Sequence, residues 1–144
     1  MTNKRTLAID FGLKRIGLAV SDPLKIIATP LDNIIASYSM QETAKLILKK
    51  MEEKKYQIDE IVIGLPLHMK GTESEGSLQV KKFKEILSEV FIGISIHLLD
   101  ERLTSVQAER SLMEGHMNRK NRAKVVDRLS AVIILQTFLE KNRI

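Results

Sequence analysis

Bulky apolar residues alternate with small or polar residues in two short segments near the beginning of the chain, residues 6–11 and 16–21. A period of two residues is typical of a β-strand, and the Gly-Leu-Lys-Arg turn between the segments predicts a β-hairpin. One face of this hairpin carries the bulky side chains. The other face carries small side chains and the carboxylate of Asp10, which is costly to bury unless it is paired or binds a metal ion.

The rest of the chain alternates between helical and strand-like patterns. Apolar residues recur at helical spacing in four segments, residues 41–55, 75–91, 103–113 and 124–139. Short apolar runs predict three further strands, at residues 26–35, 58–67 and 94–99. Pro30 makes the first of these irregular or places it at a sheet edge. A hairpin followed by alternating helices and strands predicts an α/β fold with a mixed five-stranded sheet flanked by helices, the layout of RNase H-like domains.

The composition narrows the class of protein. A length of 144 residues fits one domain, so we expect a single domain over residues 1–144. Because cysteine is absent, any metal must be held by oxygen or imidazole ligands, and a reducing cytoplasm is the expected location. We find neither a signal peptide nor an apolar run of about 18 residues, and therefore expect no membrane partner.

Acidic residues follow or interrupt apolar segments at three places. Asp10 lies in the hairpin, Asp100 and Glu101 follow the strand at 94–99, and Asp127 lies in the last helix. Strand alternation places Glu101, rather than Asp100, on the face of Ser95. We therefore expect Asp10, Glu101 and Asp127 to form one site, with Asp100 as an alternative ligand.

Each acid also has a simpler structural interpretation. Asp10 could pair with Arg15, Asp100 could cap the next helix with Arg102 as its ion-pair partner, and Asp127 could be a first-turn acid favoured by the helix dipole.

Small residues near Asp127 favour its role as the third ligand. Ser130 and Ala131 lie one turn beyond Asp127 and are small enough to let the helix approach the sheet.

Three hard oxygen ligands suit Mg²⁺ or Mn²⁺, and two such ions could activate water and stabilise the leaving oxygen in phosphodiester hydrolysis. The three acids are thus our predicted metal ligands and catalytic residues.

Basic residues gather near these acids. The chain has 23 lysines and arginines against 18 acids, a net charge of +5, which is compatible with a polyanionic partner. The predicted nucleic-acid contacts are Lys14, Arg15, Lys70, Arg102, Arg119, Lys120, Arg122, Lys124 and Arg128. Contacts to phosphates contribute affinity and positioning rather than sequence specificity. A solvated loop and helix start is the simpler interpretation of the run at 116–128.

Two further segments are expected to border the same sheet edge. They are Ser21-Asp22 and the loop at residues 64–72, which contains Lys70 and His68. His68 could contact phosphate or transfer a proton, or have no role, and we assign none to His97 or His116.

Four blocks of the sequence resemble the signature blocks of the bacterial YqgF-type nucleases. They are Leu7-Ala-Ile-Asp-Phe-Gly-Leu-Lys-Arg-Ile-Gly-Leu-Ala-Val-Ser-Asp22, Ile63-Gly-Leu-Pro-Leu through Gly71-Thr72, Asp100-Glu-Arg-Leu-Thr104 and Asp127-Arg-Leu-Ser-Ala-Val-Ile-Ile-Leu-Gln136. The resemblance covers nearly the whole chain and implies an RNase H-like fold related to RuvC-type Holliday junction resolvases. It also implies that Asp10, Glu101 and Asp127 are the metal-binding acids. Leu13, His68, Lys70 and Ser130 depart from the usual pattern of the family.

The resemblance further implies endonuclease activity in 5′-end maturation of pre-16S rRNA, with the ribosome precursor as a partner. The alternatives are a resolvase of branched DNA and a non-catalytic nucleic-acid-binding assembly factor. An ATP-using phosphotransferase would also suit the hairpin, but such enzymes need a second lobe. The oligomeric state, monomer or homodimer, stays open, as does the choice between RNA and DNA.

Overall fold

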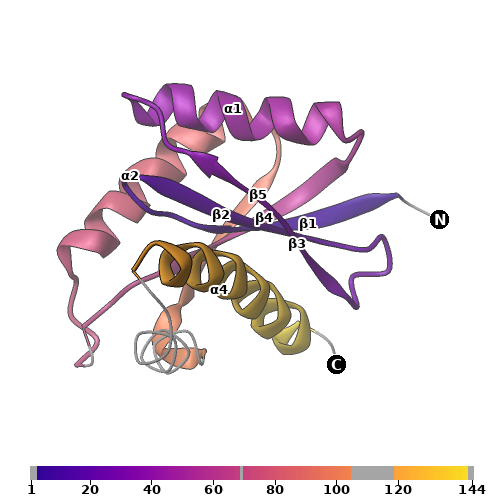
Figure 1. Cartoon of the computed structure of the whole chain (residues 1–144). Coiled ribbons are helices and arrows are strands. Elements are labelled where there is room, and N and C mark those ends of the chain that lie inside the picture. Colours follow the sequence, from indigo (N-terminus) through magenta and orange to yellow (C-terminus); the bar gives the residue numbers. More distant parts are fainter. Residues whose placement is uncertain (1–2, 69, 105–118, 143–144) are drawn as a thin grey trace.

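A computed structural model describes residues 3–68, 70–104 and 119–142, with only the backbone described for residues 119–128. Five strands form one sheet in the order β3-β2-β1-β4-β5 (Figure 1). The strands are β1 (Lys4–Asp10), β2 (Arg15–Ser21), β3 (Ala28–Ile35), β4 (Gln57–Leu65) and β5 (Ser95–Asp100). β1, β4 and β5 run parallel, whereas β2 is antiparallel to both of its neighbours. The predicted mixed five-stranded sheet is confirmed.

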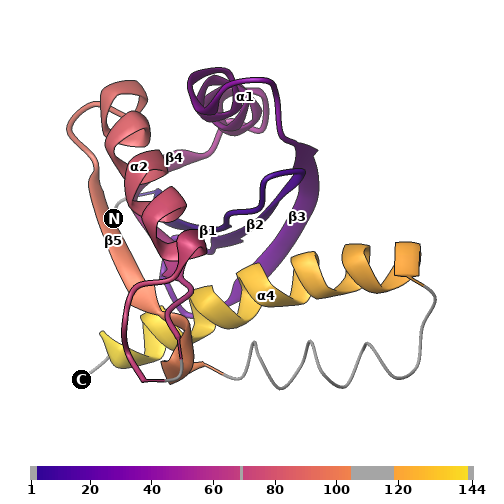
Figure 2. The same cartoon turned by 90° about the vertical axis from the view of Figure 1, so that its left-hand side faces the viewer.

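Helices cover both faces of this sheet (Figures 1 and 2). α1 (Met40–Glu53) and α2 (Glu75–Val90) lie on one face, and α4 (Arg119–Lys141) crosses the other. Ser39 caps α1 by accepting a hydrogen bond from the backbone N–H of Glu42, and Ser74 forms a capping box with Ser77 in α2. None of the helices in the described residues is both long and apolar enough to cross a membrane.

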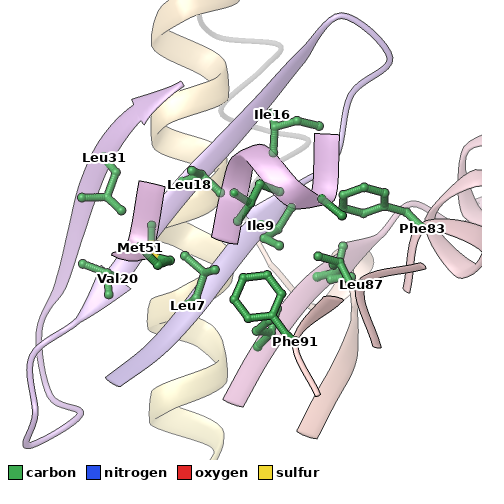
Figure 3. Close-up of a cluster of buried hydrophobic side chains, with 14 of the residues drawn as sticks. Leu7, Ile9, Ile16, Leu18, Val20, Leu31, Met51, Phe83, Leu87 and Phe91 are labelled. Atoms are coloured by element: carbon green, nitrogen blue, oxygen red, sulfur yellow. The ribbon is translucent and has the colours of Figure 1, made fainter. Parts of the chain in front are cut away.

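The two faces of the sheet differ in bulk, as the hairpin pattern predicted. Leu7 and Ile9 of β1 pack with Leu18 of β2 against Met51 of α1 and Phe83 of α2 (Figure 3). The smaller residues of the opposite face pack against α4 in a second cluster, formed by Ala8, Ala19, Val62, Leu99, Ala131, Ile134, Leu135, Phe138 and Leu139. Alanine on both sides of this interface lets α4 lie close to the sheet.

The structure confirms the predicted edge strand and differs from two predicted helix boundaries. β3 is an edge strand containing Pro30, as expected. The last helix begins at Arg119, not near 124, because arginine, lysine and alanine favour helix although the apolar periodicity starts only at Val125. Leu103 lies in a 3₁₀ turn, Glu101–Leu103, instead of starting an α-helix, and residues 105–113 of that predicted helix lie outside the described chain.

Candidate metal and nucleic-acid site

Asp10 is the last residue of β1, at the carboxyl end of the central strand. It lies opposite Gly17 of β2, which has no side chain to cover it, and is 6% exposed. Alternation from Ala8 directs it to the face that α4 covers. The hairpin therefore holds a nearly buried carboxylate between the sheet and α4.

Gly64 makes room for a second carboxylate near the end of β4. A Cβ added to Gly64 would lie only 2.7 Å from Oε1 of Glu101 and 2.6 Å from Cδ1 of Ile134 in α4. Glu101 is 2% exposed and follows β5 directly. Its carboxylate thus rests on Gly64, beneath α4, on the side of the sheet that strand alternation predicted.

Asp10 and Glu101 are brought together by the parallel order of the sheet. β4 lies between β1 and β5, and the last β1–β4 pair is Ile9 with Ile63, one residue before Asp10 and Gly64. The carboxyl ends of β1, β4 and β5 therefore meet at one edge of the sheet, where α/β proteins commonly bind ligands.

Asp100 serves a different purpose. Its carboxylate accepts hydrogen bonds from the backbone N–H of Arg102 (2.9 Å) and from Nη2 of the Arg102 guanidinium (2.6 Å). The side-chain hydrogen bond from Arg102 holds the pKa of Asp100 below its usual value, although burial acts in the opposite direction. Asp100 is therefore the cap of the 3₁₀ turn and the ion-pair partner of Arg102, as in its simpler interpretation.

Arg102 also contacts the loop that follows β4. A Cβ at Gly71 would lie 3.1 Å from Nη1 of Arg102, so the guanidinium packs against the loop backbone. Because Arg102 follows Glu101 directly, this contact places the loop at 64–72 at the same edge of the sheet as Asp10, and His68 and Lys70 within the loop are exposed. The hydrogen bond from Arg102 to Asp100 raises the pKa of the guanidinium, although desolvation opposes this.

The other predicted site residues differ in exposure, and some of their side chains lie outside the described part of the chain. Lys14 is exposed in the β1–β2 turn, and Arg15 is partly buried at the start of β2. Asp127 lies in α4, one turn before the buried Ser130 and Ala131, but its side chain lies outside the described part. The same holds for the side chains of the remaining basic candidates, Arg119, Lys120, Arg122, Lys124 and Arg128.

No group of three histidine, aspartate or glutamate side chains in the described residues, which exclude the side chain of Asp127, could hold a metal ion. Within that part of the chain, the structure brings together Asp10 and Glu101.

The expectation for Ser21-Asp22 is wrong. Because β2 is antiparallel to β1, this pair lies at the amino end of β1, and Oγ of Ser21 accepts a hydrogen bond from the backbone N–H of Thr6. The Asp22 carboxylate accepts hydrogen bonds from the backbone N–H groups of Ile27 and Ile26, and the bond from Ile27 contributes most to its lowered pKa. Asp22 thus stabilises the β2–β3 loop, far from Asp10.

Reasoning from the sequence missed the role of Gly64. A glycine at the end of an apolar strand is a signal for close approach of another group, and this signal was available. The approaching group, Glu101, is 37 positions away in the chain and could be identified only from the strand order.

Comparison with known proteins decides the family. The sequence model of RuvX, described as Holliday junction resolvase, matches residues 4–141. This chain belongs to the RuvX family. Among the relatives of this chain, a protein of Protochlamydia amoebophila is 49% identical over 96% of this chain and 94% of its own length, and one of Koribacter versatilis is 44% identical over 97% and 89%. Both are named "Putative pre-16S rRNA nuclease".

Solved structures agree on the fold. RuvC of T. thermophilus in complex with a Holliday junction substrate has a TM-score of 0.54 and 13% identity, covering 96% of both chains. Another structure of Thermus thermophilus RuvC gives a TM-score of 0.52. The RuvX chain therefore has the RNase H-like fold of RuvC, as predicted.

Proposed function

We propose that this RuvX-family protein is a metal-dependent endonuclease whose acidic site is formed by Asp10, Glu101 and Asp127. The observation that carries the proposal is the pair of nearly buried carboxylates, Asp10 at the end of β1 and Glu101 just after β5, at one edge of the sheet on the face covered by α4. α4 supplies the third acid one turn before the small residues that pack on the sheet. Asp100 is excluded from our ligand set because its carboxylate is held by Arg102.

The donor atoms fit a hard divalent cation. Two carboxylates, with space preserved by Gly64, offer the oxygen ligands that Mg²⁺ and Mn²⁺ prefer. When bound, such ions, which we expect to be two, lower the pKa of water and neutralise charge on phosphoryl oxygens. The end of β1 holds Asp10 and the 3₁₀ turn directly after β5 holds Glu101, so little reorganisation is needed as the reaction proceeds.

The surrounding cations would hold the nucleic acid. Lys14 and Arg15 lie in the hairpin beside Asp10, Arg102 follows Glu101 directly, and Lys70 lies in the loop against which Arg102 packs. The basic first half of α4 adds Arg119, Lys120, Arg122, Lys124 and Arg128. Cations on both sides of the acids would bind phosphates flanking the scissile one and fix its position.

We favour the 5′ end of pre-16S rRNA as the substrate, because relatives of this chain at 39% to 49% identity are named "Putative pre-16S rRNA nuclease". The ribosome precursor would then be the partner, and the cytoplasm the compartment. Branched DNA is the second candidate, favoured by the description of the RuvX family. A resolvase makes paired cuts and would act as a homodimer, whereas the RNA reaction requires only a monomer.

One comparison of substrates tests the proposal. The wild-type protein and Asp10→Asn are incubated with pre-16S leader RNA, unstructured single-stranded RNA and a four-way DNA junction, each with Mg²⁺ or Mn²⁺. We expect metal-dependent cleavage of the leader RNA by the wild type and none by Asp10→Asn. Cleavage of the junction alone would favour the resolvase. Equal cleavage by Asp10→Asn would reveal a contaminating nuclease, and binding without cleavage would favour a non-catalytic assembly factor.

A further inference from the structure

A fully exposed tyrosine lies at the same end of the sheet as Asp10. Tyr38 belongs to the loop between β3 and α1. This loop is tied to the β1–β2 turn, because the backbone N–H of Ala36 donates a hydrogen bond to the carbonyl of Lys14 (2.9 Å). It is also tied to α1, because the backbone N–H of Ser37 donates to Oγ1 of Thr43 (3.0 Å). Tyr38 is therefore presented from an anchored loop.

Apolar side chains lie beside Tyr38, and the turn after β1 adds a lysine. Leu13, in the turn that follows Asp10, is 72% exposed, and Lys14 beside it is exposed as well. Phe11, Leu13 and Tyr38 contribute to the lining of one hollow of about 200 Å³. An exposed aromatic ring with an apolar neighbour and a lysine matches the requirements for binding a nucleotide: a flat apolar base and a charged phosphate.

We propose that Tyr38 and Lys14 bind an unpaired nucleotide of the substrate strand at the end of the sheet that carries Asp10, with the base stacked on the Tyr38 ring and its phosphate on Lys14. The inference rests on the proposed nuclease function and specifies its substrate class. A base within a duplex has both faces covered by its neighbours and cannot stack on a side chain unless it is displaced. The substrate must therefore be single-stranded at the position that reaches Tyr38.

The opposite end of the sheet offers a natural comparison. Leu24 and Ile26 are also exposed there, in the β2–β3 loop. However, Lys25 between them forms ion pairs with Asp59 (2.8 Å) and Glu60 (3.1 Å), so the local cation is neutralised. Exposed apolar residues thus occur at both ends of the sheet, whereas an exposed tyrosine beside a lysine occurs, within the described residues, at the end that carries Asp10.

Intrinsic fluorescence can report directly on Tyr38. The chain has no tryptophan and two tyrosines, so Tyr38 is the only tyrosine in the variant Tyr56→Phe. The phenylalanine retains the ring that lies 4.8 Å from the Arg5 guanidinium, which keeps that contact. Titration with a short single-stranded RNA in EDTA, where a metal-dependent nuclease does not cleave, should quench this fluorescence as base and ring stack.

Affinity measurements with matched variants complete the test. By fluorescence anisotropy, Tyr38→Ala should bind the single-stranded RNA about tenfold more weakly, the size expected for a lost stacking ring, and Tyr38→Phe should bind nearly as the wild type. Leu24→Ala, an exposed apolar truncation at the other end, should change nothing. Affinity for a blunt RNA duplex should not depend on Tyr38.

Three results would overturn the inference. Tight binding with unchanged fluorescence and an unaffected Tyr38→Ala variant would exclude stacking, and cleavage that depends on Asp10 would then leave the nuclease function standing. An equal loss for duplex and single strand would exclude recognition of an unpaired nucleotide. Absence of binding to any nucleic acid would reject both the inference and the proposed function.

Discussion

Gly64 is the residue on which the position of the Glu101 carboxylate depends. In Gly64→Ala, the added methyl group would overlap Oε1 of Glu101 and Cδ1 of Ile134, so one or both must move. We expect a loss of about 1–3 kcal/mol in the free energy of unfolding, measured by urea denaturation. We also expect Mn²⁺ affinity to fall about 10- to 100-fold by calorimetry, because a displaced ligand binds poorly.

Gly93→Ala is the matched control for that substitution. Gly93 has a φ of 78° and no atom within 4 Å of an added Cβ, so alanine there is strained only in its backbone. It should cost about 1–2 kcal/mol without changing Mn²⁺ affinity. If both alanine variants bind Mn²⁺ like the wild type, Glu101 is not a metal ligand in the position described.

The ion pair of Asp100 with Arg102 predicts a pH dependence. Because the pKa of Asp100 is lowered in the folded state, its contribution to stability is present above the unfolded pKa of 3.8 and is lost as the pH falls through the folded pKa. In Arg102→Gln the pKa of Asp100 should rise, as seen by NMR titration of its carboxyl carbon. The difference in unfolding free energy between wild type and Arg102→Gln should shrink as the pH falls below 3.8. A pKa of Asp100 that is the same in both proteins would contradict the described pair.

For single residues, the sequence predicted the face of the sheet on which a side chain lies better than it predicted which other residue that side chain contacts. Strand alternation correctly placed Asp10 and Glu101 on the α4 side because it depends only on the backbone period. The pairing of Asp100 with Arg102 was an open alternative that the structure favours. The contact of Glu101 with Gly64 was not predictable, since it requires knowing which strand lies beside β5.

Among the helices and strands, the packing of α4 on the sheet depends on small residues. Ala131 is fully buried against Ala8 and Ala19 of the hairpin. Ala131→Leu should force the helix away from the sheet and destabilise the protein by about 1–3 kcal/mol in urea denaturation. Gln136→Leu, which adds a leucine at an exposed position of the same helix, should change stability by no more than about 0.5 kcal/mol. Equal stability of the two variants would mean that α4 is not tightly packed on the hairpin.

Element boundaries were predicted where a single local signal dominates. The hairpin, α1 and α2 were predicted from clear periodicity, and the structure adds the serine caps Ser39 and Ser74 at the starts of the two helices. The start of α4 was placed too late because charged helix formers before Val125 carry no apolar period. Ser21-Asp22 was placed at the wrong end because a residue after an antiparallel strand was treated like one after a parallel strand.

In the whole molecule, the strand order brings residues that are far apart in the sequence to one edge of the sheet. The sheet order places β4 between β1 and β5, so Asp10, Gly64 and Glu101 share one edge although they are far apart in the chain. α4 covers the face of the sheet on which these residues lie (Figure 2). The same edge carries Lys14 and Tyr38, while the ion pairs of Lys25 lie at the other end. Our functional proposals thus concern a single edge of the sheet.

The most direct test of the central claim is the Mn²⁺-dependent rate of phosphodiester cleavage in leader RNA by the wild type, Glu101→Gln and Asp100→Asn. We predict that Glu101→Gln lowers the rate at least about 100-fold, because it removes a metal ligand. Asp100→Asn should weaken the 3₁₀ turn but retain most of the activity. An active Glu101→Gln beside an inactive Asp100→Asn, or no metal-dependent cleavage by the wild type, would contradict the account.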